Sequence, residues 1–147
     1  KDGALRHEKL IPAWIIHLLA NANGLAMQTR VISADAQPVL RVLSREDAAE
    51  RLDQLLAALQ AGMQAPLPSA RKTAYAGLRS VERNPGAAAT LSYEGNSFVP
   101  IPGERDEDAC LARAWPDFSA LHAGGFEHWL PLYQALADAV LPTEVDA

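Results

Sequence analysis

The sequence has one cysteine, no long apolar run and no leader-like segment. A lone thiol, Cys110, cannot form an internal disulfide, which fits a reducing cytoplasm. The longest apolar candidate, residues 10–27, is interrupted by a proline, a histidine and two asparagines, whereas a membrane helix needs about 20 predominantly apolar residues. We therefore expect a cytoplasmic protein without a membrane span or a signal peptide.

Sequence motifs for common enzymatic chemistry are also missing. The chain contains no phosphate-binding loop, no dinucleotide-binding glycine pattern and no G-x-S-x-G nucleophile motif. The four histidines have no metal-ligand spacing, and Cys110 has no second cysteine beside it, so the sequence predicts no zinc site. We expect no cofactor, no bound metal and no catalytic residue.

The 147 residues are 49% hydrophobic and 21% charged, which is typical of a globular domain. The first residue is Lys1 rather than methionine. We expect residues 1–147 to form a single domain, or most of one, excised from a longer chain.

Charge is divided unevenly along the sequence. Residues 1–83 carry a net charge of +3, and residues 84–147 carry −8. The acidic half would repel phosphate, so any DNA contact should come from the first half. Four basic residues and an aromatic one are closely spaced there and are the DNA-contact candidates: Arg71, Lys72, Tyr75, Arg79 and Arg83. The alternative is a solvated face, or ion pairs between these residues and the acidic half.

Periodicity predicts a helix, a hairpin and a second helix in the first 63 residues. Apolar residues at helical spacing predict a helix from Leu10 to Ala22 with one broad buried stripe: Leu10, Ile11, Trp14, Ile15, Leu18, Leu19 and Ala22. Alternating segments at 27–33 and 38–43, joined by "ADAQ", predict a β-hairpin. Ser44 and Asp47 resemble a capping box at the start of the next helix, whose expected buried stripe is Ala48, Leu52, Leu55, Leu56, Leu59 and Met63.

The later elements are less sharply marked. Residues 73–78 fit either helix or strand, and Asn84 with Pro85 should begin a helix. Residues 94–108 read as a loop with an acidic end, followed by a helix from Asp106 to Trp115. A final helix should bury a stripe that runs from Phe126 to Leu141.

The strand–turn–strand–helix succession of residues 28–56 resembles the part of restriction-endonuclease-like nucleases that carries the metal-binding acids. Cleavage by such enzymes requires carboxylates that converge on a cation. The strands "QTRVIS" and "VLRVL" contain no acid and no lysine, and Asp35 lies in the turn, where it serves turn geometry. His17, at the edge of the first helix's apolar stripe, is interpreted as a polar flanking residue. Glu104, Asp106, Glu107 and Asp108 are interpreted as helix N-terminal and solvating charges rather than a cation site.

Several stretches in this order resemble the C-terminal region of RecC, the gamma subunit of exodeoxyribonuclease V. Trp14 and His17 stand in a W-x-x-H-L-L pattern, "PLP" occupies 66–68, and Lys72 follows it. "YEGN" and the acidic stretch that begins at Gly103 and Glu104 come later, with Tyr93 where the family commonly has tryptophan. The likeness extends over nearly the whole chain.

The resemblance implies an α/β domain with a degenerate PD-(D/E)XK-type nuclease fold, in which helices flank a small sheet and the catalytic residues are absent. It also implies assembly with the helicase–nuclease (beta) subunit and the second helicase (alpha) subunit of exodeoxyribonuclease V, and the handling of DNA ends in recombinational repair. Two alternatives stay open: a metal-dependent nuclease whose acids come from elsewhere in a parent chain, and a protein-interaction domain unrelated to DNA.

Overall fold

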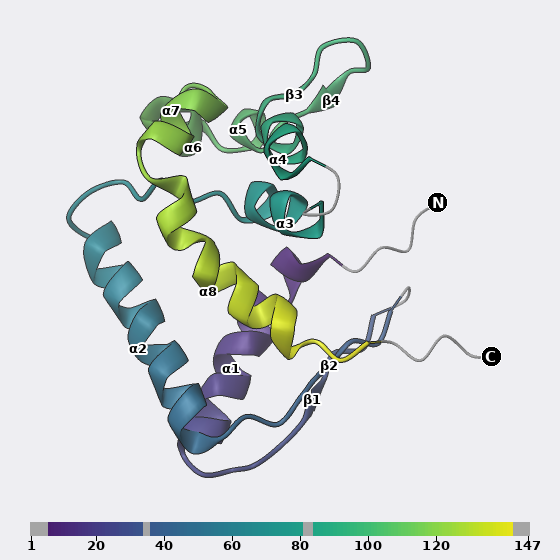
Figure 1. Cartoon of the computed structure of the whole chain (residues 1–147), viewed down its shortest axis with the longest axis vertical. Coiled ribbons are helices and arrows are strands. Elements are labelled where there is room, and N and C mark those ends of the chain that lie inside the picture. The colour runs from purple at the N-terminus through teal and green to yellow at the C-terminus, as the bar shows by residue number, and fades with distance from the viewer. Residues whose placement is uncertain (1–5, 34–35, 81–83, 143–147) are drawn as a thin grey trace. The chain divides into compact units, whose positions relative to one another are not determined.

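The computed structural model describes residues 6–33, 36–80 and 84–142, and helices dominate it (Figure 1). Two small antiparallel sheets of two strands each complete the described part. The elements are η1 (His7–Lys9), α1 (Ile11–Ala22), β1 (Thr29–Arg30), β2 (Val39–Leu40), α2 (Arg45–Gly62), α3 (Arg71–Arg79), α4 (Pro85–Glu94), β3 (Gly95–Asn96), β4 (Ile101–Pro102), α5 (Glu104–Glu107), α6 (Ala109–Ala114), α7 (Phe118–Ala123) and α8 (Phe126–Ala139).

The chain divides into two compact units. The first consists of Lys1–Gln60 and Gln134–Ala147, so far as they are described, and the second of Ala61–Tyr133. Of the described helices, none combines the length and the apolarity that crossing a membrane requires.

Helix α1 forms where the sequence predicts it, but its buried face is partly polar. Leu10, Trp14 and Leu18 are buried as expected, and His17 and Asn21 are buried with them. Ile15 and Leu19, which the apolar spacing placed in the buried stripe, are 41% and 48% exposed instead. The apolar residues of this helix surround it, so periodicity alone misplaced the buried face by part of a turn.

The predicted hairpin is present, although its ladder is short. Thr29 pairs with Leu40 and Arg30 with Val39, and Ser33 and Ala36 bond across the turn. After α8 the chain returns to this hairpin, where Leu40 forms an isolated antiparallel bridge with Val140. Because the strands are only two residues long, the α/β prediction overstated the sheet. Turn residues Ala34 and Asp35 lie outside the described part of the chain.

Helix α2 begins at the predicted capping box. Ser44 Oγ accepts the Asp47 N–H at 3.0 Å and donates to Asp47 Oδ2 at 2.7 Å. Only the alanines Ala48 and Ala58 are buried on this helix. The leucine stripe is therefore shallower than predicted: Leu52 and Leu55 are half-buried, and Leu56, Leu59 and Met63 are exposed.

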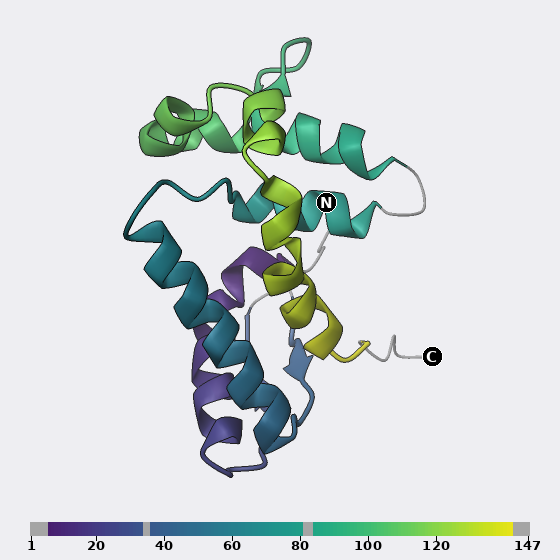
Figure 2. The ribbon, with the colours of Figure 1, turned by 60° about the vertical axis from the view of Figure 1, so that its left-hand side comes forward.

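Helices α3 and α4 lie side by side in the second unit (Figure 2). The ambiguous stretch at 73–78 is helical and belongs to α3. Asn84 caps α4 as predicted, because its Oδ1 accepts the Ala87 N–H at 3.0 Å and Pro85 follows as the first helical residue.

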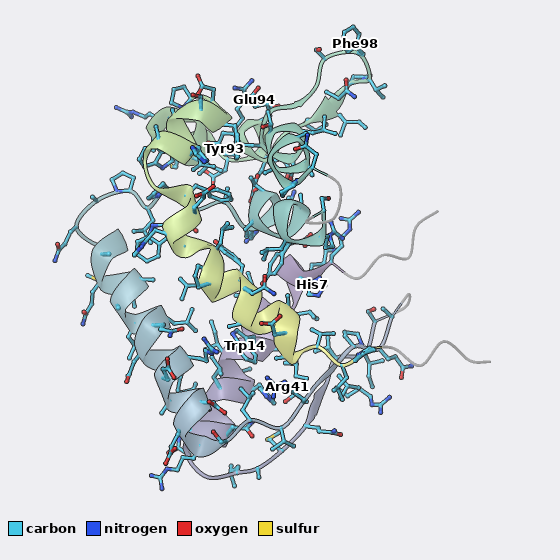
Figure 3. All side chains as sticks on the ribbon, viewed as in Figure 1. His7, Trp14, Arg41, Tyr93, Glu94 and Phe98 are labelled. Carbon is cyan, nitrogen blue, oxygen red and sulfur yellow. The ribbon has the colours of Figure 1, made fainter. Side chains whose placement is uncertain are left out.

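The segment predicted as a loop folds instead into the hairpin β3–β4 and the one-turn helix α5. Gly95 has a φ of 78°, and a Cβ on Gly103 would lie 2.5 Å from Gly95 N, so two glycines permit this close approach. Phe98 occupies the tip of the hairpin (Figure 3). The helix predicted from Asp106 to Trp115 is broken at Asp108, whose carboxylate caps α6 by accepting the N–H groups of Cys110 and Leu111.

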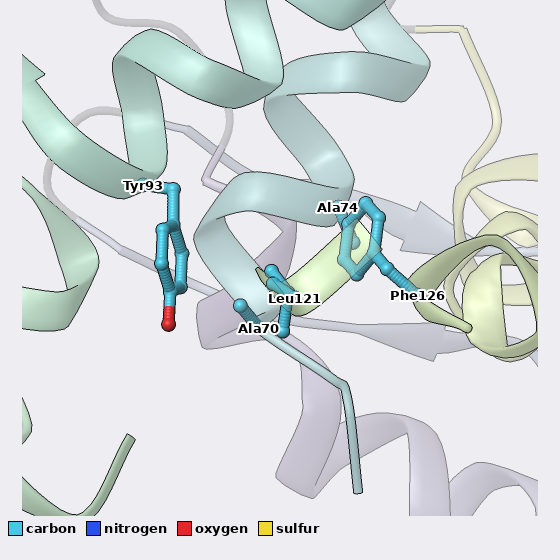
Figure 4. Packing of buried hydrophobic residues seen from close by; sticks show 5 residues of the cluster. All are labelled: Ala70, Ala74, Tyr93, Leu121 and Phe126. Atoms are coloured by element: carbon cyan, nitrogen blue, oxygen red, sulfur yellow. The ribbon is translucent and has the colours of Figure 1, made fainter. Parts of the chain in front are cut away.

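The core of the second unit gathers residues from four helices and one connecting segment. Ala70, Ala74, Tyr93, Leu121 and Phe126 are all buried there, with Leu121 beside Ala70 and the Phe126 ring next to Ala74 (Figure 4). The Tyr93 hydroxyl donates to the carbonyl of Trp115 at 2.6 Å. Burial raises the pKa of Tyr93 to about 12, and the charge of Arg105 opposes the shift in part.

Candidate nucleic-acid interface

Helix α3 carries four of the five predicted DNA-contact residues. Arg71 and Arg79 are exposed at its two ends, and Lys72 is partly exposed. The fifth residue, Arg83, lies outside the described residues. The predicted set is therefore brought together on one short helix, as far as the chain is described.

Tyr75 occupies a different environment from the basic residues. Its side chain is 2% exposed and meets Tyr133 edge to face, with ring centroids 5.4 Å apart. A base could stack on Tyr75 only if the ring left this packing. Its role here is in the interior of the second unit.

The N-terminus of α3 is occupied by a carboxylate from α5. Glu104 is 8% exposed, and its Oε1 and Oε2 accept the backbone N–H groups of Lys72 and Thr73 at 3.1 and 2.8 Å. Ala70 precedes the helix and cannot cap it with a side chain. The first-turn amides, which attract phosphate at other helix starts, are thus satisfied by a carboxylate within the chain.

Lys72 is neutralised from the same acidic segment. Its Nζ forms an ion pair with Glu107 Oε2. Both residues line a pocket of about 300 Å³, together with Ser69, Ala70, Arg71, Glu104, Asp108, Leu111 and Tyr133. Its lining sets three carboxylates against two cations, Arg71 and Lys72, so the formal charge of the lining is −1 and does not favour an anion.

This geometry separates the two interpretations of the basic cluster. For Lys72, the ion pair with the acidic half is confirmed. Arg71 and Arg79 place their side chains at the surface, where a phosphate backbone could reach them. DNA contact by the cluster stays a prediction.

The second place of interest is His17, which lies on α1 and bonds to Thr29 of β1 and to Arg41 directly after β2. It is completely buried, in contrast to the flanking position inferred from the sequence. Nε2 donates to the carbonyl of Arg41 at 3.1 Å, and Nδ1 accepts from the hydroxyl of Thr29 at 2.9 Å. This tautomer is assigned because a carbonyl oxygen can only accept. Burial lowers the pKa of His17, and the bond to Arg41 opposes that shift.

Asn21 extends the same buried network one turn further along α1. Its Nδ2 donates to the His17 carbonyl at 2.9 Å, and its Oδ1 accepts the N–H groups of Met27 and Leu43 at 3.4 Å each. His17 and Asn21 therefore attach α1 to the segments on both sides of the hairpin. A sequence pattern could have predicted this burial: His17 and Asn21 are spaced i and i+4, on the helix face that also carries Trp14 and Leu18.

Metal ligands do not converge in the described part of the chain. Among residues 6–33, 36–80 and 84–142, no group of three or more His, Cys, Asp or Glu side chains is placed to hold a metal ion. In the hairpin, the described strand residues that carry charge are arginines, with Arg30 on β1 and Arg41 directly after β2.

Comparison with known families gives a match to a model described as the RecC C-terminal domain, over residues 1–82. The matched range contains α1, the β1–β2 hairpin, α2 and α3, and ends before α4. No curated protein sequence matches the chain. More than half of the chain is covered by the family model, and the chain belongs to the RecC C-terminal domain family, whose parent protein is a subunit of RecBCD.

Proposed function

We propose that this chain is the non-catalytic C-terminal domain, or most of it, of an exodeoxyribonuclease V gamma subunit. It scaffolds the helicase–nuclease complex and helps to handle DNA ends during double-strand-break repair by homologous recombination. The observation that carries this proposal is the RecC C-terminal domain match over residues 1–82.

The domain is best understood as a degenerate PD-(D/E)XK-type nuclease framework. The succession of α1, hairpin and α2 supports this interpretation, because it keeps the order of elements around a nuclease metal site while its strands offer Arg30 and Arg41. His17 supports it as well. Both of its ring nitrogens are engaged by Thr29 and Arg41, so neither is available to a metal ion or to a metal-bound water.

Protein partners suit the acidic half of the chain better than DNA does. Residues 84–147 carry a net charge of −8, which repels a phosphate backbone. The beta and alpha subunits of exodeoxyribonuclease V are the proposed partners. Contact with DNA ends is then confined to the basic part of the domain, where Arg71 and Arg79 are exposed.

Deleting the domain tests the scaffolding role. The full-length gamma subunit, with and without residues 1–147, is mixed with purified beta and alpha subunits and examined by sedimentation velocity. We expect loss of the three-subunit species on deletion. Full assembly without the domain would contradict the proposal.

Charge reversal tests the DNA contact within the assembled complex. Arg71→Glu combined with Arg79→Glu should weaken the binding of forked duplex ends and lower its salt dependence, because two phosphate contacts are lost. The matched control is Lys72→Met, whose cation is already paired with Glu107, and it should have a smaller effect. Equal effects of the two changes, or none, would remove α3 from the DNA surface.

A further inference from the structure

The tip of the β3–β4 hairpin is the most exposed apolar feature among the described residues. Phe98 is 96% exposed, and its neighbours Val99 and Ile101 are 52% and 59% exposed. Figure 3 shows Phe98 at the far end of the hairpin loop, directed away from the elements that carry it. A large aromatic ring held in water is unfavourable, so such a tip indicates a surface that is covered in an assembly.

The tip is braced by hydrogen bonds within the hairpin, two of them to the Asn96 side chain and one between backbone groups. Asn96 Oδ1 accepts the N–H groups of Phe98 and Val99 at 2.9 and 3.3 Å, and the Ile101 N–H donates to the Val99 carbonyl at 2.6 Å. Pro100 and Pro102 fix two further φ angles. A preorganised tip loses little conformational entropy on binding, which favours its use as an anchor.

At the base of the hairpin, the backbones of its two ends approach each other closely. A Cβ on Gly95 would collide with the Ile101 carbonyl, and a Cβ on Gly103 with the Tyr93 carbonyl. Only glycine fits at these two positions. The two ends of the hairpin are therefore in close backbone contact beside the buried Tyr93.

Charge around the hairpin decides which class of partner fits. Residues 95–103 contain no charged side chain. They are flanked by an acidic collar of Glu94, Asp106, Glu107 and Asp108, whose neighbouring cations are Arg105 and Lys72, so four carboxylates stand against two cations, a net charge of −2. Glu104 is buried as the cap of α3 and does not belong to this collar. This acidic collar repels the phosphates of a nucleic acid. It attracts basic side chains, so a protein pocket with an apolar floor and a basic rim is complementary to both parts.

We infer that the Phe98 tip is a protein-docking anchor: the ring enters an apolar pocket on a partner protein, and lysine or arginine side chains at the rim of that pocket face the acidic collar. The inference rests on the proposed function in so far as that partner is another subunit of the same complex.

The test uses the full-length gamma subunit and its purified partner subunits. Phe98→Ser should weaken assembly by about tenfold or more, because a buried aromatic anchor dominates such interfaces. Met63→Ser is the matched control, since Met63 is 81% exposed and lies far along the chain from the hairpin; its effect should stay within about twofold. Thermal unfolding of both variants should match that of the unaltered subunit, because neither side chain is buried.

Glu94→Gln tests the basic rim of the pocket separately. Glutamine keeps an oxygen that can accept the Phe118 N–H, which Glu94 Oε1 now accepts at 2.9 Å, and it removes the charge. Assembly should weaken and become less sensitive to salt. No change in either quantity would overturn the charge complementarity on which the choice of a protein partner depends.

Three further outcomes are decisive. Unchanged assembly for Phe98→Ser, when deletion of the whole domain abolishes assembly, would overturn the anchor and leave the proposed function standing. Unchanged assembly both for Phe98→Ser and for deletion of the whole domain would overturn the anchor and the proposed function together. Intact assembly with weakened binding of forked DNA ends by Phe98→Ser would assign the tip to nucleic acid, and so would also overturn the inference.

Discussion

Glu104 caps the helix that carries Thr73, across 31 residues of sequence: its Oε2 accepts the Thr73 N–H at 2.8 Å. The same carboxylate accepts the Lys72 N–H through Oε1. Because the preceding residue is Ala70, α3 has no local cap, and α5 supplies one from a distant part of the chain. The acidic segment that looked like a solvating run thus holds the basic helix in place.

Removing this cap should destabilise the second unit. Glu104→Ala leaves two first-turn amides unpaired in a buried position and should lower the free energy of unfolding by about 1–3 kcal/mol, and Glu104→Gln should recover part of that loss. Glu107→Gln is the control, because its ion pair with Lys72 is half-exposed and should contribute under about 1 kcal/mol. Urea unfolding followed by circular dichroism measures both. Equal losses would show that Glu104 acts only as a surface charge.

His17 should make stability depend on pH on the acidic side. Burial lowers the folded pKa of His17 below the unfolded value of about 6.5. At a pH between the two pKa values, His17 is therefore protonated in the unfolded chain and neutral in the folded chain. The contribution of His17 is complete above about pH 6.5 and is lost as the pH falls through the folded pKa. Melting temperatures of the unaltered chain and of His17→Asn, measured at several pH values, check this. Identical pH profiles for the unaltered chain and His17→Asn would contradict the buried network.

Tyr93 should produce the opposite behaviour in alkali. Its folded pKa is about 12, whereas an unfolded tyrosine has a pKa near 10. The stability that Tyr93 contributes is present below about pH 10 and disappears as the pH rises from about 10 to about 12. Burial raises the pKa of Tyr133 as well, so ultraviolet titration of tyrosinate should detect more than one late-ionising tyrosine, and Tyr93→Phe should remove one of them. Ionisation of all tyrosines together near pH 10 in the folded chain would refute the assignment.

Replacing two glycines of the second unit with alanine should have opposite effects on the free energy of unfolding. Gly103→Ala places a methyl group against the backbone at Tyr93 and Glu94, and it should cost at least about 2 kcal/mol. Gly86→Ala, in the first turn of α4, meets nothing closer than 3.7 Å and should stabilise the chain by up to about 1 kcal/mol. Thermal unfolding of the two variants compares them. A neutral Gly103→Ala would mean that the base of the hairpin is not tightly closed.

The sequence predicted those features of the fold that depend on residues close together in the chain. Ser44 and Asn84 were recognised as helix caps, because each acts on amides three residues away. The Glu104 cap was missed, since nothing in the sequence connects residue 104 to residue 73. The β3–β4 hairpin was read as a loop because its strands consist of glycine, asparagine, isoleucine and proline rather than alternating β-branched residues.

The first unit shows the same limit. The hairpin and both helices were predicted, but their sheet is smaller than an α/β fold requires. Apolar residues of α1 outnumber those that one buried face can hold, so the pattern did not reveal that His17 and Asn21 are inside and Ile15 and Leu19 are outside. Burial of polar groups depends on partners such as Thr29 and Arg41, which only the folded chain brings together.

The proposal that this domain performs no cleavage is tested most directly by measuring magnesium-dependent DNA degradation. The assay compares the purified full-length gamma subunit alone with the reconstituted three-subunit complex. We predict no cleavage by the gamma subunit alone, and we predict that the complex cleaves DNA equally well with and without His17→Asn, provided that the variant complex assembles. Magnesium-dependent cleavage by the gamma subunit alone, abolished by His17→Asn in a variant that remains folded, would contradict the account.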